Sequence, residues 1–263
     1  MKKIGIIYIC TGNYWKFWQD FFESSEHFFL NDCEKLYFLY TDNRNIFYNK
    51  NSRIKIIYSK YNKWPFSTLL RYKLIYDCLD LYNNIDYLIF CNSNLLFLKK
   101  INLIELFNNK PMFATLHPGY FKKFTDKLPF EKNKYSTAYF ERDIKAKYFC
   151  GGFNGGSMEK YLEMSKQLML NIDKDLKNNI IAKWHDESHF NKYVNKNLEL
   201  FNIIDPSFCY PENRLINTER NILVRDKDKI ISLKHKGIFY NLRYTFIKKI
   251  RSFKNFIIDF LLN

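Results

Sequence analysis

The sequence predicts an α/β protein whose central, mostly parallel sheet is flanked by helices. Short apolar runs typical of strands alternate with helical apolar patterns along the first part of the chain. We expect strands over residues 5–10, 35–40 and 54–58, and helices over residues 14–29 and 67–82. Residues 86–91 are apolar at nearly every position, as a strand covered on both faces requires. Ligands of such sheets bind beyond the carboxyl ends of the strands, so residues 11–13 and 92–94 are candidate binding positions.

The size and charge of the chain narrow the choice of partner. It has 263 residues, 47% of them hydrophobic, with neither an internal repeat nor a linker, which predicts one continuous domain with a full core. The net charge of +15 indicates an anionic partner, but nucleic acid, membrane phospholipid and nucleotide diphosphate all satisfy it. The aromatic residues follow core periods and lack the stacking motifs of RNA-binding sheets, so we expect no nucleic acid partner.

The cysteines and the N-terminus indicate a cytoplasmic protein. None of the six cysteines forms a C-x-x-C pair, and Cys10, Cys78 and Cys91 lie in apolar runs, so we expect reduced thiols. The apolar run after Met1 is too short for a signal peptide, and no segment is long enough to span a bilayer.

The string WHDESH at residues 184–189 holds more titratable groups than a hydrophobic core needs. If a helix begins at Glu187, the residues before it lie at its N-terminus, where backbone N–H groups and side chains converge on a ligand. A zinc site on His185 and His189 is the alternative, but the protease motif requires glutamate where this chain has Asp186. The string therefore predicts a site other than a metallohydrolase centre.

Residues 151–156 contain four of the eight glycines, between a strand-like run at 147–150 and a helix that starts near Ser157. Such a cluster indicates either positive φ angles or a backbone that approaches another surface closely. A tight turn from strand to helix would use the first property. A close-fitting, uncharged pocket wall would use the second, and we favour it because the spacing matches neither G-x-G-x-x-G nor a P-loop.

At this point the residues resemble a known family. WHDESHFNKY at residues 184–193 is nearly identical to the WHDESHLNKY of the retaining glycosyltransferases of the histo-blood-group A/B and α-1,3-galactosyltransferase family (family 6). Further landmarks stand in family order at residues 64–71, 86–88, 117–120, 136–139 and 151–156. The resemblance covers about residues 4–230 and is greatest to the short bacterial members. It implies a single-domain glycosyltransferase-A (Rossmann-like) fold with a catalytic domain over residues 1–237.

One departure from the family concerns the metal. Where the vertebrate members carry Asp-x-Asp to hold manganese, this chain has Asn92, Ser93 and Asn94, and neutral amides are poor ligands for a cation that bridges two phosphates. We therefore expect a metal-independent enzyme of the bacterial branch, with no metal site, in which these residues bind ribose or the donor sugar. Cations would meet the diphosphate charge, and Lys227 best fits the phosphate-contacting lysine of the bacterial relatives. The remaining candidates, which a solvated basic face explains equally well, are Arg225, Lys229, Lys234 and Lys236.

The resemblance also implies the reaction, which is displacement of UDP from an α-linked sugar with net retention. An oxocarbenium-like centre needs a carboxylate on its opposite face, and we expect Glu187 to act as nucleophile or as stabiliser of that cation. The expected donor contacts are Ile9, Cys10, Thr11, Tyr14, Trp64, Arg71, His185 and Asp186, the first four lying beneath uracil and ribose. The expected acceptor contacts are His117, Trp184, Glu187 and Glu212. For Tyr14 and Trp64, ordinary core packing is an equally open interpretation.

Donor choice in this family depends on space at the positions of Cys150, Gly151 and Gly152. Glycine at the third position leaves room for an acetamido group, and Gly119 matches the A-type enzymes. We therefore expect UDP-N-acetylgalactosamine (UDP-GalNAc) as donor and a Fuc-α1,2-Gal unit as acceptor. A B-type enzyme that uses UDP-galactose and a non-catalytic sugar-binding protein are the alternatives.

The last segment, residues 238–263, predicts a basic amphipathic helix. Apolar residues recur at helical spacing and lysines and arginines fill much of the other face, which suits an anionic bilayer surface. A closing helix docked on its own domain or on a second subunit is the alternative. Peripheral contact with the inner face of the cytoplasmic membrane would suit an enzyme of lipopolysaccharide synthesis.

Overall fold

The structure is a computed structural model that describes residues 1–141 and 143–231. The predicted helix over 238–263 and the candidate cations Lys234 and Lys236 lie outside these residues. Within the described part of the chain, no helix is both long and apolar enough to cross a membrane.

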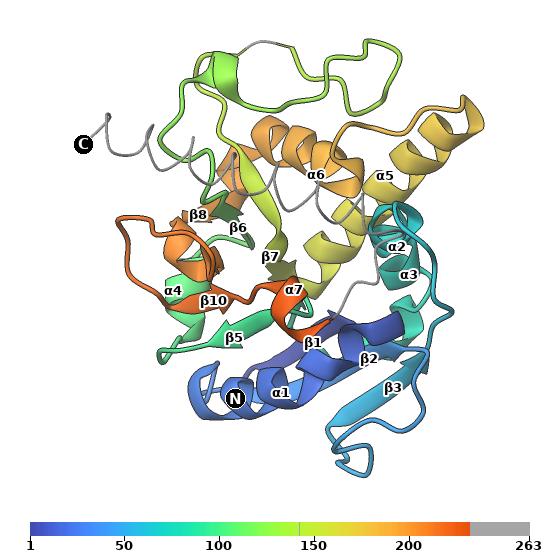
Figure 1. Ribbon diagram of the computed structural model, residues 1–263, viewed down its shortest axis with the longest axis vertical. Helices are drawn as coiled ribbons and strands as arrows, with labels where there is room; N and C mark the ends of the chain where they lie inside the picture. The colour runs from blue at the N-terminus through green and yellow to red at the C-terminus, as the bar shows by residue number, and fades with distance from the viewer. Residues whose placement is uncertain (142, 232–263) are drawn as a thin grey trace.

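The described residues form a seven-stranded sheet in the order β3-β2-β1-β4-β7-β6-β8 (Figure 1). Its strands are β1 (Lys3–Ile9), β2 (Glu34–Thr41), β3 (Ile54–Tyr58), β4 (Tyr87–Cys91), β6 (Met112–Leu116), β7 (Phe149–Ser157) and β8 (Phe201–Ile204). All neighbours pair in parallel except β7, which is antiparallel to both β4 and β6. The predicted α/β fold with a mostly parallel central sheet is confirmed.

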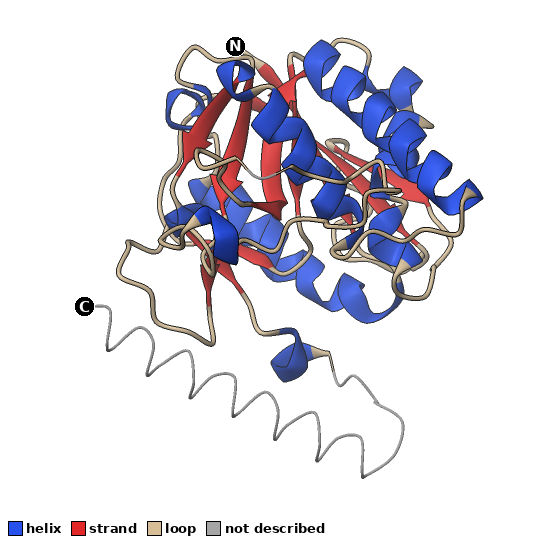
Figure 2. Cartoon of the chain, turned by 90° about the horizontal axis from the view of Figure 1, so that it is seen from above, coloured by secondary structure: helices blue, strands red, loops and turns tan. Residues whose placement is uncertain are grey.

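Helices cover both faces of the sheet and create two cores (Figure 2). Side chains of β1 alternate between them: Ile6 and Tyr8 lie in the core beneath α1 (Trp18–Phe28), and Ile7 lies in the other. The helices of the second core are α3 (Arg71–Tyr76), α5 (Met158–Lys177) and α6 (His185–Lys196).

The two helices expected in the first half are present but interrupted. The first begins as a 3₁₀ turn, η1 (Gly12–Phe17), before α1. The second divides into α2 (Phe66–Leu69), α3 and η2 (Leu79–Tyr82), because Leu70 and Cys78 leave the helical region of φ and ψ. The shorter elements are β5 (Leu95–Phe97), α4 (Leu103–Phe107), η3 (Thr125–Lys127), η4 (Leu198–Leu200), η5 (Pro206–Cys209), β9 (Tyr210–Pro211), β10 (Ile222–Val224) and α7 (Lys227–Ile230).

The strand order changes direction between β1 and β4. The chain passes from β1 to β2 and β3 on one side, whereas β4 pairs with the other side of β1, with Tyr8 opposite Cys91. The Tyr8 hydroxyl donates a 2.8 Å hydrogen bond to the carbonyl of Ser93. Residues 9–11 and 92–94 therefore lie side by side at the point where open α/β sheets bind ligands, as the sequence predicts.

The glycine cluster is strand and not turn. Residues 151–156 lie inside β7, and no described glycine other than Gly12 has a positive φ. Close approach explains the composition instead: a Cβ on Gly155 would lie 2.6 Å from the Phe113 ring and 2.9 Å from the Leu88 carbonyl oxygen. The turn interpretation is wrong, and the glycines allow β4 and β6 to pack against β7.

A small second sheet, β5-β10-β9, brings the end of the described chain to the end of β4. β5 begins directly after the Asn92–Ser93–Asn94 turn, and β10 pairs with it in antiparallel orientation. Residues 225–231 consequently lie beside the topological switch point, although they are far from it in sequence.

Candidate active site

The WHDESH string forms the first turn of α6, which begins at His185, two residues before the predicted start. His185 has a φ of +52°, a left-handed conformation that is uncommon for a residue with a Cβ. The Trp184 amide donates to the Ser188 hydroxyl at 2.9 Å and fixes the entry to the helix. Asp186 and Glu187 thus occupy the first helical turn, where the backbone favours negative charge.

Arg71 connects this turn to β7. Its guanidinium forms a buried ion pair with Asp186 and donates to the carbonyl oxygen of Gly151. The ring of Phe90 lies 4.2 Å from the guanidinium carbon. Burial raises the pKa of Asp186, and the neighbouring Glu187 adds to this, while the charge of Arg71 opposes it. Arg71, which the family resemblance implies to be a donor contact, is therefore ion-paired with a carboxylate of this turn.

Glu187 is held at both carboxylate oxygens. One accepts from the Gly151 amide at 2.8 Å and the other from the Tyr148 hydroxyl at 3.1 Å. Burial raises the pKa of Glu187, and these two donors together with Arg71 partly offset the rise. The carboxylate that the sequence places at the reaction centre is thus fixed in orientation by the strand that carries the glycine cluster.

His117 is a half-buried imidazole beside Tyr148. Burial lowers its pKa to about 4, and the positive charge of Arg214 acts in the same direction. Its Nδ1 accepts from the Gly119 amide at 3.0 Å, so the ring proton is on Nε2, which can donate to a ligand. The ring centroid lies 5.8 Å from that of Tyr148. Tyr148 therefore contacts both His117 and Glu187.

Two tryptophans stand at the mouth of the site. Trp184 is 43% exposed and Trp64 is 72% exposed, with the Trp64 ring edge-on to His185 at a centroid distance of 5.0 Å. The core-packing interpretation of Trp64 is therefore wrong. Both rings are exposed, and Trp64 contacts His185, which is the other residue of this pair that was expected to contact the donor.

The residues at the end of β1 that were predicted to contact the donor substrate differ in exposure. Cys10 is fully buried, and burial raises the pKa of its thiol to about 12, so its side chain is a core group. Ile9 is half-buried against the second core, and Thr11 is 9% exposed. Tyr14 is half-buried, with the Lys227 ammonium 5.1 Å from the centre of its ring. Tyr14 and Lys227 are thus brought together across the end of the sheet.

The three residues of the Asn-x-Asn turn differ in exposure and in hydrogen-bond partners. Asn94 is 2% exposed. Its side-chain nitrogen donates to the backbone carbonyl of Arg225 at 2.7 Å, and its backbone carbonyl accepts from the backbone amide of Arg225. Ser93 is equally buried, and its carbonyl accepts from Tyr8. Asn92 is half-buried and faces Gly152, whose carbonyl accepts from the Asn92 amide at 2.8 Å. Asn92 is therefore the member of the turn whose side chain borders the open site.

The predicted cations differ in their ion-pair partners. Arg225 is ion-paired with Asp20, and Lys229 with Glu212 at 2.8 Å. Burial lowers the pKa of Lys227, and the charge of Arg71 lowers it further, so these two cations lie within electrostatic range of each other. Among the described candidate cations, Lys227 is the one whose pKa reports the charge of Arg71.

Glu212, predicted to contact the acceptor, bonds to residues at the start of α7. Its carboxylate accepts from the Asp226 amide at 2.5 Å and from the Lys229 ammonium, which ties β9 to α7. Both oxygens are used in these contacts. The structure thus gives Glu212 a part in holding residues 226–229 in place.

Comparison with known sequences decides the family. The sequence model of glycosyltransferase family 6 matches residues 2–229. The chain belongs to glycosyltransferase family 6. It is 32% identical over 226 residues to the O-antigen biosynthesis glycosyltransferase WbnI of Escherichia coli, covering 86% of this chain and 95% of that relative. The resemblance seen in the sequence is confirmed.

Vertebrate relatives of this family 6 glycosyltransferase are more distant. Histo-blood group ABO system transferase 1 of Rattus norvegicus is 27% identical over 198 residues, which are 73% of this chain and 56% of the relative. Globoside alpha-1,3-N-acetylgalactosaminyltransferase 1 of Gallus gallus is 27% identical over 197 residues, which are 72% of this chain and 57% of the relative. The chain spans nearly all of the bacterial relative but little more than half of the vertebrate ones.

The residues at the turn do not fit the divalent cation of the vertebrate family members. Asn94 commits its nitrogen to a backbone carbonyl, and neither asparagine carries charge. Across residues 1–141 and 143–231, no group of three His, Cys, Asp or Glu side chains could hold a metal ion. The residue that the turn contacts through Asn94 is Arg225, whose backbone carbonyl and amide both bond to it.

Sequence reasoning missed two residues that shape this site. Tyr148 donates to Glu187, and Asn191 joins Glu187 to β7: its side-chain nitrogen donates to the carbonyls of Glu187 and Phe149, each at 2.9 Å. The Phe149 amide donates back to the Asn191 oxygen at 2.8 Å. A usable signal existed for Asn191, because it lies four residues after Glu187 and therefore on the same helix face.

We expect Arg71→Ala to lower the free energy of unfolding by about 3–5 kcal/mol, because it leaves the buried carboxylate of Asp186 without its partner. Adding Asp186→Asn should restore part of the loss, since the amide carries no charge. Urea denaturation measures both changes. The matched control is Arg53→Ala, whose ion pair with Glu26 is partly exposed and should contribute less than about 1 kcal/mol. Equal losses in the two single variants would contradict the assignment.

Proposed function

We propose that this glycosyltransferase moves N-acetylgalactosamine from UDP-GalNAc to O3 of the galactose in a Fuc-α1,2-Gal acceptor, with retention and without a metal. The observation that carries the proposal is the carboxylate of Glu187, held by the Gly151 amide and the Tyr148 hydroxyl beside the buried pair of Arg71 and Asp186. A carboxylate fixed at both oxygens is prepared to face a developing positive charge.

In the proposed reaction the bond between the sugar C1 and the β-phosphate oxygen breaks, and UDP leaves with the electron pair. Glu187 stabilises the resulting oxocarbenium-like centre or bonds to it as nucleophile. The acceptor oxygen then forms the new bond to C1, and its proton passes to the leaving diphosphate or to solvent. Asp186, fixed by Arg71, would accept hydrogen bonds from donor-sugar hydroxyls.

The diphosphate charge would be met by cations and not by a metal ion. Lys227 has its ammonium over the ring of Tyr14 and lies within electrostatic range of Arg71. A lysine whose pKa is lowered by burial gains stabilisation of its charge when a phosphate binds beside it. Asn92 would supply hydrogen bonds to the ribose or the donor sugar.

The choice of N-acetylgalactosamine rests on the space at Gly152. A Cβ built there would meet Asn92 alone, at an ordinary contact distance of 3.5 Å. The glycine is therefore not required by the packing of the protein, which supports a role in leaving room for an acetamido group.

On the acceptor side, the Nε2 proton of His117 and the exposed ring of Trp184 would bind galactose. The bacterial relative is named for O-antigen biosynthesis, which supports an acceptor within a bacterial surface glycan. UDP-galactose is the alternative donor.

Glu187→Gln should reduce sugar transfer on the order of 10³-fold, because the amide has the same shape but cannot carry the negative charge that the reaction requires. UDP-GalNAc should still bind with little change. Initial rates and calorimetric donor binding measure the two properties separately. Transfer at a near-normal rate would remove Glu187 from the mechanism.

Gly152→Ala should lower kcat/KM for UDP-GalNAc about 10- to 100-fold, because the methyl group fills the space assigned to the acetamido group. UDP-galactose serves as the matched control on the same protein and should be affected much less. A parallel loss with both donors would show that this position does not select the sugar.

Turnover should be unchanged in excess EDTA, because cationic side chains and not a bound ion neutralise the diphosphate. The measurement is the initial rate after dialysis against chelator, with and without added manganese. Loss of activity that manganese restores would show that the asparagines do hold a metal.

A further inference from the structure

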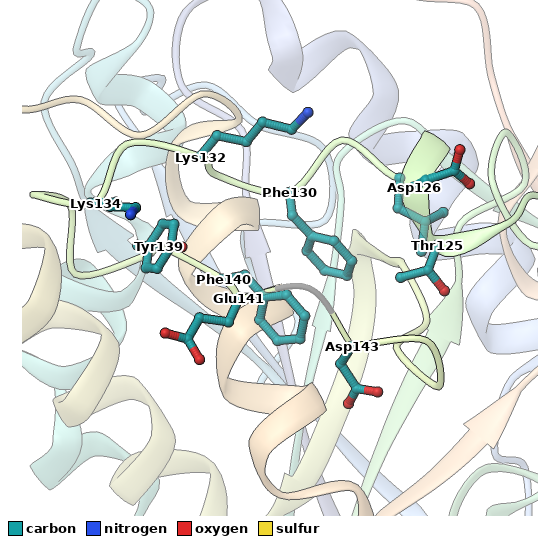
Figure 3. Close-up of a pocket in the computed structure, with 10 residues that line it drawn as sticks. Thr125, Asp126, Phe130, Lys132, Lys134, Tyr139, Phe140, Glu141 and Asp143 are labelled. Carbon is teal, nitrogen blue, oxygen red and sulfur yellow. The ribbon is translucent and has the colours of Figure 1, made fainter.

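A second cavity, of about 400 Å³, opens in the segment between β6 and β7 (Figure 3). The volume lies in the range of small-ligand sites. Its lining residues are Thr125, Asp126, Leu128, Phe130, Lys132, Lys134, Tyr139, Phe140, Glu141 and Asp143. None of these residues has a part in the site described above.

The cavity combines aromatic rings with exposed charged groups. Phe130 and Phe140 stack with their centroids 4.3 Å apart and an interplanar angle of 21°, and Figure 3 shows both rings at its centre. Lys132, Lys134 and Glu141 line the cavity and are exposed. Apolar rings surrounded by donors and acceptors match a sugar ring, which has apolar faces and a rim of hydroxyls.

The rings of the cavity are continuous with the acceptor side of the active site. The Phe130 centroid lies 5.5 Å from that of Tyr148, whose hydroxyl donates to Glu187. Tyr148 in turn lies 5.8 Å from His117, centroid to centroid. Two ring contacts therefore separate the cavity from the imidazole proposed to bind the acceptor galactose.

A second connection leads to Trp184. The carboxylate of Glu131 accepts from the Lys183 amide at 2.5 Å, directly before Trp184 in the chain. Phe130 and Lys132, the neighbours of Glu131, line the cavity. The segment that lines the cavity is thus bonded to the residue that precedes the proposed acceptor-stacking tryptophan.

The wall of the cavity is fixed to the helices of the active site. Asp175 of α5 accepts from the Ser136 hydroxyl at 2.5 Å and from the Thr137 amide at 2.7 Å. Lys192 of α6 donates to the Thr137 carbonyl at 2.7 Å. Ser136 and Asp175 are buried, so the anchor is rigid and shares α6 with Glu187.

We propose that this cavity is a distal acceptor subsite, which binds the sugars on the reducing side of the terminal disaccharide. The proposal rests on the proposed function, because it assumes that the acceptor galactose lies between His117 and Glu187. The enzyme would then recognise an oligosaccharide and not only its last two units. Aromatic rings would contact the pyranose, and Lys132, Lys134 and Glu141 would bind its hydroxyls.

The test compares the disaccharide Fuc-α1,2-Gal with a tetrasaccharide that ends in it. Wild type should have a kcat/KM about tenfold higher for the tetrasaccharide. The double variant Lys132→Ala with Lys134→Ala, and separately Tyr139→Ala, should lose this advantage while disaccharide turnover stays the same. Lys122→Ala is the matched control, since this lysine lies in the same segment over the Phe121 ring and outside the cavity.

Equal turnover of both acceptors by wild type, or an equal loss for both in the variants, would overturn the subsite. Calorimetric titration of the tetrasaccharide into the UDP-loaded protein separates this from the proposed function. If no acceptor is turned over, binding that weakens in the double variant but not in Lys122→Ala supports the subsite alone. Absent binding, or binding that the double variant leaves unchanged, overturns it.

Discussion

The buried guanidinium of Arg71 is the interaction on which the arrangement of this site depends. It joins three elements at once: it belongs to α3, pairs with Asp186 at the start of α6 and donates to the Gly151 carbonyl in β7. Removing Arg71 or Asp186 would leave the other as a buried charge without its partner. The position of Glu187 follows, because the next residue after Asp186 reaches the Gly151 amide from the same helical turn.

Strand β7 gives the site its second constraint. Its glycines let the strand pass close to Phe113 and Leu88, and its residue 151 supplies both a donor to Glu187 and an acceptor to Arg71. One residue therefore contacts both Glu187 and Arg71 through its backbone. The neighbouring Gly152 faces Asn92, so the strand that orients the carboxylate also lines the space assigned to the donor sugar.

Much of this could be predicted from the sequence, and the failures share a physical cause. Apolar periodicity located the strands of the first half and the central strand, since it reports burial directly. It could not show that residues 151–156 are extended, because glycine signals permissiveness and not a conformation. The sequence also could not show the partners of three polar residues that were candidate ligand contacts. Asn94 bonds to Arg225, Glu212 to Asp226, and Arg225 to Asp20. Pairings between residues far apart in the sequence have no local signature.

The link between Asn94 and Arg225 joins residues 131 positions apart, and Lys227 follows two residues later. A chain is synthesised from its N-terminus. Helix α6, which carries Asp186 and Glu187, and most of the sheet therefore emerge from the ribosome before this lysine. A nascent polypeptide can therefore assemble its anionic centre while the ammonium that accompanies Tyr14 is still missing. In the proposed function, Lys227 could therefore contact the diphosphate only after this part of the chain has emerged.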